Sequence, residues 1–485
     1  MPDSGLASVL VAPDQFPMTS LRCLLLFGLV VATTVRAGQL RIGAAAADIT
    51  PELGVLLDGT ISKNGPATKI HDRLHARCVV FDDGETRVAL VIIDNTMVAR
   101  EILDDARARV HAAADIPARH ILLAATHTHS TPRAVDIGQG EANEKYHRFM
   151  AKQIAVGVQT AVKNLRPAGL GWGSYDEPRF VFNRRWFVDK KLTPPNPFGE
   201  KGDRVWMNPP RGALINPAGP VDTEVYVMAA RRPDGTPVFL LGNYGLHYVG
   251  GTRRGEISAD YFGIFSEHVK QLLATPKQQP AFVGLMSNGT SGDVNAINFQ
   301  GERVRRPAYV RMREIGTAIA TNAAALYRGL KFQRTAKIEV AWREISLGVR
   351  KPNAKRLAWA RETIAKAKPT KRPPRNVIYA NEAIGLSKYP DRVKIILQAI
   401  RIGDLAIAAI PNEVFAQTGL MIKAQSPFRD TFVVELANGY SGYLPYPKQH
   451  EWGGYETWPA RSSFLEVQAE PKIKATVREL LNELK

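Results

Sequence analysis

The feature that most constrains this fold is a set of short, nearly continuous apolar runs, each of which ends in a loop of reactive side chains. Strands that are apolar at successive positions are typical of a sheet covered on both faces. In such sheets, ligands bind beyond the carboxyl ends of the strands. The clearest runs are His120–Ala125, Val238–Asn243, Ala281–Met286, Leu405–Ile410 and Thr431–Leu436. The sequence therefore predicts strand ends that converge on one pocket.

Amphipathic helical patterns alternate with these runs, and no fixed-period repeat is evident. The predicted helices are Ala142–Leu165, Tyr261–Leu273, Arg306–Leu330, Asn412–Lys423 and Ile473–Leu484. Two further strands are Arg87–Ile93 and Lys394–Ile400, and the second forms a hairpin with Leu405–Ile410 around Gly403-Asp404. This alternation predicts an α/β fold with mixed sheets covered by helices, in a single large domain over residues 38–485.

The N-terminal segment has the order of parts of a secretory signal peptide. The apolar run Leu24–Ala32 follows Arg22 and precedes Val35–Ala37, whose outer residues are small. The run is shorter than the ~20 residues that span a bilayer. We expect residues 1–37 to be a signal peptide cleaved after Ala37, with translation from Met18 as an alternative start. The protein is then secreted or periplasmic, without a transmembrane segment after signal removal; the alternative is a membrane anchor.

Composition excludes several classes of protein. Hydrophobic residues make up 45% and charged residues 23% of the 485 residues, which excludes a disordered, collagen-like or coiled-coil chain. The two cysteines, Cys23 and Cys78, cannot form a disulfide-rich scaffold or a cysteine-based zinc module. Lys and Arg number 64 against 46 Asp and Glu, so the formal net charge is +18.

Part of this charge lies in a basic insertion, Arg350–Arg375, with ten Lys and Arg and a single acidic residue. Its middle, Ala354–Lys368, predicts a short basic helix. The simpler interpretation is that this insertion is a solvent-exposed surface of the protein. The alternative is a contact with an anionic surface or with the rim of a site.

The loops that follow the apolar runs carry His127, His129, His247, Glu413 and Tyr443. Two neutral imidazoles and a carboxylate are a common catalytic zinc set that leaves a position for water. His127 and His129 are two residues apart in an extended segment, so both can face the same way. Taken singly, each signal has a structural alternative: a satisfied core histidine, a carboxylate at a helix N-terminus, or loop packing.

Further motifs follow one another from about residue 41 to residue 460. They are Gly43–Thr50, His71–Arg77, Thr126–Ser130, Asn183-Arg184, Asn243–His247, Ile257–Asp260, Gly292–Val294, Pro411–Glu413, Tyr443 and Tyr455-Glu456. In these segments the chain resembles the catalytic N-terminal domain of the neutral/alkaline (non-lysosomal) ceramidase family.

The resemblance implies one zinc ion per chain, bound by four side chains: His127, His247, Glu413 and Tyr443. It also implies catalytic residues that line the site and contact the substrate carbonyl or the transition state: His129, Arg184 and Tyr455. Zinc would acidify a water molecule and polarise a carbonyl group. One of these neighbouring residues would then stabilise the developing oxyanion.

Two departures from the family's pattern bear on the substrate. The family's catalytic serine follows Gly-Asp-Val, where this chain has Asn295. An asparagine cannot be a covalent nucleophile, but its amide can donate a hydrogen bond, so we assign Asn295 to the catalytic set as an oxyanion donor; the alternative is a turn residue. The family also carries a C-terminal immunoglobulin-like domain, for which the 30 residues after Tyr455 are too few.

The sequence thus predicts an exported, zinc-dependent hydrolase with a single large catalytic domain, which cleaves an amide or another acyl bond by metal-activated water. Basic clusters at Arg303–Arg306 and Arg350–Arg375 favour an anionic small molecule or glycan over long-chain ceramide. No platform of interleaved aromatic and basic residues indicates nucleic acid. The alternatives are a metal-dependent deacetylase or lyase acting on an anionic glycan, and a non-catalytic binding protein on the same scaffold.

Overall fold

The computed structural model describes residues 38–59, 65–137, 143–370 and 372–485, together with Leu10. The chain divides into two units, Met1–Arg36 and Ala37–Lys485, and the second holds the fold. Apart from Leu10, the predicted signal peptide lies outside the described residues. Within the described ranges, no helix has both the length and the apolar character that a bilayer crossing requires.

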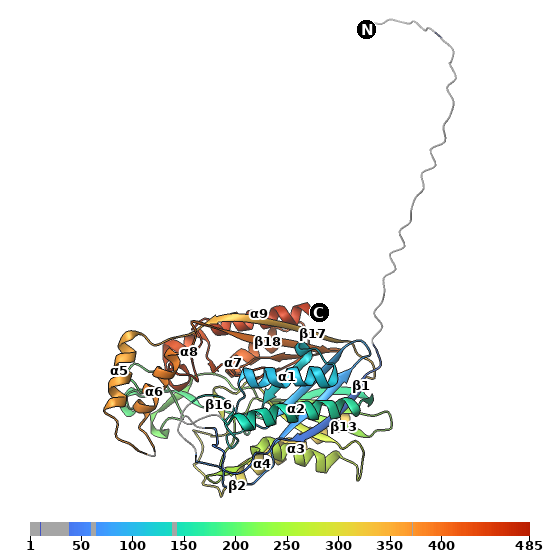
Figure 1. Cartoon of the computed structure of the whole chain (residues 1–485), viewed down its shortest axis with the longest axis horizontal. Helices are drawn as coiled ribbons and strands as arrows, with labels where there is room; N and C mark the ends of the chain where they lie inside the picture. The colour runs from blue at the N-terminus through green and yellow to red at the C-terminus, as the bar shows by residue number, and fades with distance from the viewer. Residues whose placement is uncertain (1–9, 11–37, 60–64, 138–142, 371) are drawn as a thin grey trace, which may run out of the picture. The chain divides into compact units, whose positions relative to one another are not determined.

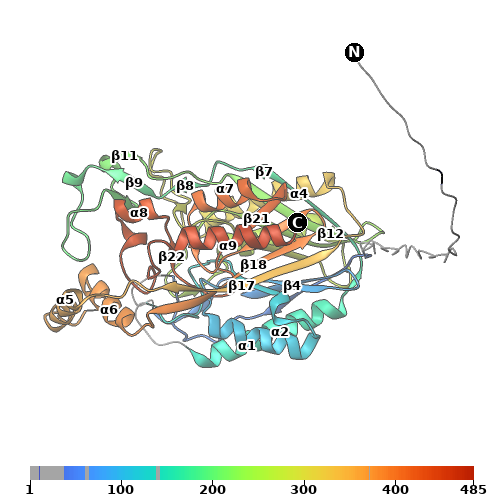
Figure 2. The ribbon, with the colours of Figure 1, turned by 90° about the horizontal axis from the view of Figure 1, so that it is seen from above.

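The first of three large sheets has the strand order β5-β4-β3-β1-β6. Its strands are β1 (Arg41–Asp48), β3 (His75–Asp82), β4 (Arg87–Ile93), β5 (Ile121–Ala125) and β6 (Arg166–Pro167). Helix α1 (Arg100–Ala114) connects β4 to β5, which are parallel, and α2 (Glu144–Lys163) follows β5. Both helices cover one face of this sheet, as Figures 1 and 2 show.

The second and third sheets have the strand orders β15-β13-β12-β7 and β21-β19-β18-β17. The second contains β7 (Gly169–Asp176), β12 (Glu224–Arg231), β13 (Pro237–Tyr244) and β15 (Val283–Asn288), with α3 (Asp260–Leu273) and α4 (Val310–Gly329). The third contains β17 (Ile338–Gly348), β18 (Arg392–Ile402), β19 (Leu405–Ala409) and β21 (Asp430–Val434), with α7 (Ala416–Gln425) and α9 (Ala469–Glu483).

The three sheets repeat one topology. Each has three antiparallel strands, a helix, a fourth strand parallel to the third, and a second helix. The longest insertions fall between the first and second strands, at residues 49–74, 177–223 and 349–391. Because these insertions differ in length, the repeat leaves no fixed period in the sequence.

The inner faces of all three sheets share one core, in which Val79, Phe239 and Ile400 are buried together. The helix pairs cover the outer faces, so the strands are buried on both sides, and every residue of β5 and β13 is buried. This confirms the predicted α/β fold with mixed sheets covered by helices. It also explains why these strands are apolar at successive positions.

Most predicted elements occur within a few residues of their expected bounds, and the hairpin around Gly403 is present. Helix α7 begins four residues later than predicted, because Glu413–Val414 forms β20 and pairs with β22 (Tyr443–Leu444). The segment Asp189–Pro220, rich in proline and glycine, is not only loop. It contributes β10 (Val205–Met207) and β11 (Leu214–Pro217), which pair with β9 (Arg185–Val188). The other short elements are β2 (Lys69–Ile70), β8 (Phe182–Asn183), β14 (Glu256–Ile257), β16 (Val294–Asn295) and α8 (Pro447–Trp452).

The basic insertion forms α5 (Ala354–Ala365), which packs against α6 (Arg375–Ser387). Arg350 is tied to the fold, because its guanidinium donates hydrogen bonds to the backbone carbonyls of Thr457, Ser463 and Leu465. Arg356 lies 3.0 Å from Glu200 and 3.6 Å from the ring centre of Phe198. Some of the positive charge in this segment therefore stabilises the fold.

The close packing of helix α3 on β15 gives a stability prediction. A Cβ atom on Gly284 would lie within about 3.0 Å of the Ser266 backbone and of the Val269 side chain. Gly284→Ala should therefore push α3 away from the sheet and lower the free energy of unfolding by about 1–3 kcal/mol, as other overpacked cores do. Gly329→Ala is the control, because nothing lies within 4 Å of its Cβ position at the end of α4. Urea denaturation of both variants measures the difference, and equal midpoints would contradict the packing argument.

Candidate metal centre

His127 lies at the sharp turn that ends β5. Its backbone has a φ of 75°, in the left-handed region that side chains other than glycine rarely adopt. Two hydrogen bonds to the end of β4 hold this turn: Thr126 N donates to the Ile93 carbonyl and His127 N to the Asn95 carbonyl. Holding a residue other than glycine in this conformation costs on the order of 1 kcal/mol or more of conformational free energy. Residues held in this way cluster at functional sites.

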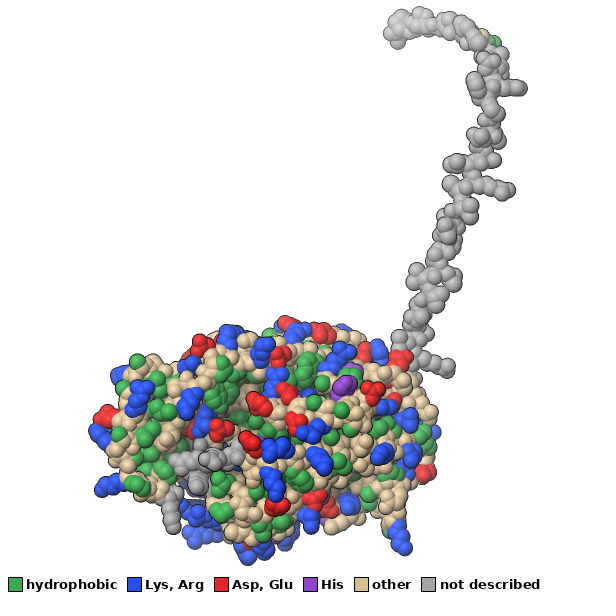
Figure 3. Space-filling view, viewed as in Figure 1, with side chains coloured by type: hydrophobic (Ala, Val, Ile, Leu, Met, Phe, Trp, Pro, Cys, Tyr) green, Lys and Arg blue, Asp and Glu red, His purple; other side chains and the backbone are tan. Residues whose placement is uncertain are grey.

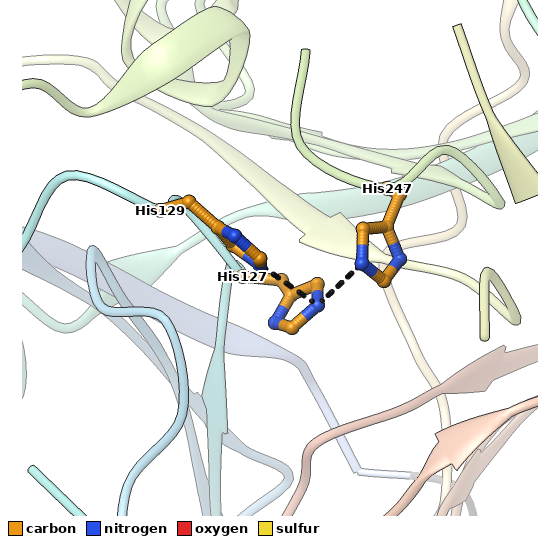
Figure 4. Close-up of side chains that lie close together, drawn as sticks. All are labelled: His127, His129 and His247. Atoms are coloured by element: carbon orange, nitrogen blue, oxygen red, sulfur yellow. Dashed lines mark hydrogen bonds between the residues drawn. The ribbon is translucent and has the colours of Figure 1, made fainter. Parts of the chain in front are cut away.

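Three histidine side chains meet beyond the strand ends (Figure 4). The Nε2 atoms of His127 and His247 are 2.9 Å apart, and those of His127 and His129 are 3.3 Å apart. His127 and His129 follow β5, whereas His247 follows β13 in the second sheet. One nitrogen from each of the three lies within 4.8 Å of the other two, so the cluster can hold a metal ion.

The hydrogen bonds of the other ring nitrogens fix the protons of this pair. His127 Nδ1 lies 2.8 Å from the Thr96 carbonyl, and His247 Nδ1 lies 3.1 Å from the Ser291 carbonyl. A carbonyl only accepts hydrogen bonds, so each Nδ1 carries a proton, and in a neutral ring Nε2 is then the nitrogen that presents a lone pair to a metal ion. Burial, together with the charge of Arg184, holds the pKa of His247 well below its usual value. Two lone pairs that face each other at 2.9 Å fit a bound cation.

Glu413, in β20, adds a carboxylate to the cluster. Its Oε2 atom lies 3.3 Å from His127 Nε2 and 3.8 Å from His247 Nε2, and it is buried without a hydrogen-bond donor among the described residues. Its Oε1 atom accepts a hydrogen bond of 2.9 Å from Tyr440. Burial opposes ionisation, but the charge of Arg184 and a hydrogen bond from Tyr443 help to hold the pKa of Glu413 below its usual value. A buried carboxylate oxygen with no donor suits a metal ligand.

Arg184 and Tyr443 also border the cluster. Strand β22 pairs with β20 so that Tyr443 stands opposite Glu413. Arg184 donates a 3.1 Å hydrogen bond to the Tyr443 hydroxyl, and its Nη1 atom lies 3.0 Å from His247 Nε2. Glu456 accepts a 3.0 Å hydrogen bond from Arg184 Nε. Burial and the charge of Glu413 raise the pKa of Tyr443 well above its usual value.

A cavity of about 50 Å³ borders the cluster, and its lining includes Asp58, His129, Tyr440, Tyr443 and Tyr455. His129, which we assigned to the catalytic set, belongs to the histidine cluster itself, and its ring stacks on Tyr248 at 3.5 Å. Burial holds the pKa of His129 well below its usual value. The predicted metal-ligand residues and the predicted catalytic residues His129, Arg184 and Tyr455 therefore lie together.

Asn295 lies in β16, and its side chain connects two loops. Its Nδ2 atom donates a 2.7 Å hydrogen bond to Asn208, and its Oδ1 atom accepts one of 2.9 Å from the Ile297 backbone. Asn295 is not in the lining of the cavity beside the cluster. These bonds are typical of a residue that fixes a turn, and its role as an oxyanion donor stays a prediction.

The sequence analysis missed Glu435, at the end of the third sheet's last strand. Its buried carboxyl group accepts hydrogen bonds of 2.5 Å from Ser291 Oγ and of 2.7 Å from Val414 N. Ser291 supplies the carbonyl that holds His247, and Val414 follows Glu413. Glu435 therefore connects the loops that carry two residues of the cluster. The sequence does point to Glu435, because it is the one acidic residue in the apolar run 431–436.

Three sheets that bring buried histidines and a carboxylate together at their strand ends define a mixed α/β protein with a candidate metal site. The model of the neutral/alkaline non-lysosomal ceramidase N-terminal family matches residues 40–307, and this chain belongs to that family. The fold is similar to that of the neutral ceramidase from Pseudomonas aeruginosa, with a TM-score of 0.68 and 19% identity over 92% of this chain and 74% of the other. It is also similar to a ceramidase complexed with C2, with a TM-score of 0.69 and 19% identity over 92% and 75%.

The position of His127 in the cluster predicts a difference between neighbouring histidines. His127 Nε2 has short contacts with His247, His129 and Glu413, whereas among the described residues His129 Nε2 has a hydrogen-bond contact with His127 alone. His127→Ala should abolish zinc binding, and His129→Ala should weaken it less. Metal content after dialysis and elemental analysis measures both, with His268→Ala on helix α3 as the control. Equal metal content in the wild type and His127→Ala would show that the cluster is not the metal site.

Glu435 yields a second prediction. Burial raises the pKa of Glu435 well above its usual value, so the neutral carboxyl group resembles the amide of glutamine. Glu435→Gln should therefore retain metal affinity. Glu435→Ala should lower it by roughly 10- to 100-fold, as other losses of a group that orients metal ligands do. Zinc titration of both folded variants checks this, and wild-type affinity in Glu435→Ala would remove Glu435 from the positioning of the site.

Proposed function

We propose that this chain is a zinc-dependent hydrolase that cleaves an amide, or another acyl bond, of a polar or acidic substrate. The observation that carries the proposal is the convergence, from the three sheets, of two imidazole nitrogens and a carboxylate oxygen that has no hydrogen-bond donor among the described residues. His127, His247 and Glu413 would hold the ion together with Tyr443. A zinc ion bound there supplies an acidified water and a Lewis acid for the carbonyl group.

The neighbouring residues have the properties that this chemistry needs. His129 is held neutral, so its ring can accept a hydrogen bond from the attacking water and orient it. Arg184 is buried and positively charged beside the cluster, where it can stabilise an oxyanion. Burial raises the pKa of Tyr455, so its hydroxyl stays protonated and can donate a hydrogen bond in the same cavity.

Two further parts of the proposal rest on the sequence. The order of basic, apolar and small residues in 1–37 favours export to the periplasm or the outside of the cell. The net charge of +18 favours an anionic substrate, because a cationic rim raises the local concentration of anions.

The proposal predicts metal-dependent hydrolysis. Removal of zinc by a chelator should abolish the cleavage of one or more members of a panel of N-acyl amino acids, acylated acidic sugars and ceramide, and added zinc should restore it. Product analysis reports the bond: a free amine and acid for the amidase, acetate for a deacetylase, and an unsaturated sugar for a lyase. His268→Ala serves as the active control and His127→Ala as the inactive one. Zinc binding without turnover on the whole panel would favour the non-catalytic binding protein instead.

A further inference from the structure

A second cavity, of about 370 Å³, lies beside the loops that carry the metal cluster. Val249, which lines it, is two residues beyond His247 and next to Tyr248, whose ring stacks on His129. Ala296, which also lines it, directly follows Asn295. The rest of the wall comes from residues 297–306, Arg211 and the start of α4. The second cavity therefore borders the loop that carries His247 and Tyr248, whereas the cavity beside the cluster is lined from the loops of the first and third sheets.

The lining of this second cavity is strongly basic. Four arginines line it against a single carboxylate of Glu302, and they are Arg211, Arg303, Arg306 and Arg311. In the described part of the chain, the acidic partner of these arginines is Glu314, which pairs with Arg311 at 2.8 Å and with Arg306 at 3.4 Å. Among the residues that the structure describes, Arg303 has no hydrogen bond or ion pair. Lys and Arg side chains also gather along the lower edge of Figure 3, where Figure 1 labels β2 and α4.

Arg211 holds the wall of the cavity in place without losing its charge. Its guanidinium donates hydrogen bonds of 3.0 Å to the backbone carbonyls of Asn298 and Phe299, and another to that of Gly301. These acceptors are neutral, and no described carboxylate pairs with Arg211. These bonds fix the loop around a positive charge that no described carboxylate neutralises. Because the loop is already ordered, a ligand that binds there costs it less conformational entropy.

Helix α4 adds positive potential from its N-terminal end. The helix has 20 residues, and Tyr309, the residue before it, makes no capping hydrogen bond with its side chain. Its first turn contains no acidic residue and carries Arg311, which lines the cavity. The helix dipole favours negative charge at this end, so a basic first turn is the reverse of the stabilising arrangement. An anion in the cavity would interact favourably with both the dipole and the arginines.

The cavity also has an aliphatic part. Ile297 and Val304 line it and are 47% and 56% exposed, which is unusual for large apolar side chains. Val249 and Ala296 extend this apolar surface toward the metal loops. A ligand that fits both parts carries an anionic group next to a small aliphatic group.

We propose that this cavity is a substrate subsite that binds an anionic group of an acyl compound, while the acyl bond lies at the metal cluster. The inference rests on the proposed hydrolase function and narrows its substrate to a carboxylate, or a comparable anion, with an adjacent aliphatic side chain. Arg303 and Arg306 bind the anion. Arg211 and Arg311 make the electrostatic potential of the cavity positive. Ile297 and Val304 contact the aliphatic group.

The test uses a matched pair of ligands that differ only in charge, N-acetyl-L-leucine and N-acetyl-L-leucinamide. The zinc-loaded full chain should bind the carboxylate at least about tenfold more tightly than the amide, as measured by isothermal titration calorimetry. The preference should fall at high salt, because exposed charges are screened beyond roughly 8–10 Å at 0.1–0.15 M ionic strength.

The double variant Arg303→Gln/Arg306→Gln should lose most of the preference and retain its affinity for the amide. Arg328→Gln/Arg478→Gln is the matched control, because both arginines are exposed, at the end of α4 and on α9, and their loss also changes the net charge by two. An equal loss of preference in the control would show a general effect of net charge and overturn the subsite. A preference for the carboxylate that persists in the double variant would also overturn the subsite.

Hydrolysis separates this inference from the function on which it rests. If neither compound is cleaved but the preference depends on Arg303 and Arg306, the anion site stands and the amidase proposal fails for these compounds. If both are cleaved at equal rates with equal affinity, the hydrolase stands and the anion subsite fails. Competitive inhibition of hydrolysis by a non-cleavable carboxylate, relieved in the double variant, would show that the two cavities serve one substrate.

Discussion

The close approach of His127 Nε2 and His247 Nε2 is the constraint on which the site depends. Two neutral imidazoles turn their lone pairs toward each other only if something else holds the rings, and here backbone carbonyls do so. The Thr96 carbonyl comes from the loop after β4, and the Ser291 carbonyl from the loop after β15. Ser291 is in turn held by Glu435, which follows β21. Each of the three sheets thus contributes to the position of one pair of nitrogen atoms.

The repeated topology explains how residues more than a hundred positions apart reach one place. In every sheet a helix returns the chain to the same end, so the last two strands are parallel and their loops leave from the same edge. His127 follows β5 in the first sheet, His247 follows β13 in the second, and Glu413 follows β19 in the third. The shared central core then fixes the three edges relative to one another.

The sequence predicted strands well where a strand is buried on both faces, because such a strand is apolar at successive positions. Strand β4, for example, has the bounds that its apolar pattern predicts. It was less informative where pairing is decided by tertiary contacts. Strand β1 is a run of alanines, a residue with helical propensity, and it is a strand because β3 pairs with it along its whole length. The start of α7 was set too early because β20 depends on β22, thirty residues away. Glu435 escaped notice for the same reason, since its partners come from two other loops.

Net charge alone does not say where an anion binds on this chain. Much of the positive charge is compensated inside the fold: Arg184 and Arg185 share the buried Glu456, and Arg350 is bound by backbone carbonyls. The basic helix α5 has partners of its own, since Lys366 pairs with Glu362 and Arg356 with Glu200. The arginines of the second cavity differ: Arg306 and Arg311 share the one carboxylate of Glu314, Arg211 bonds to backbone carbonyls, and Arg303 has no partner among the described residues. A local excess of charge of this kind, in a wall already held in place, determines where an anion is stabilised.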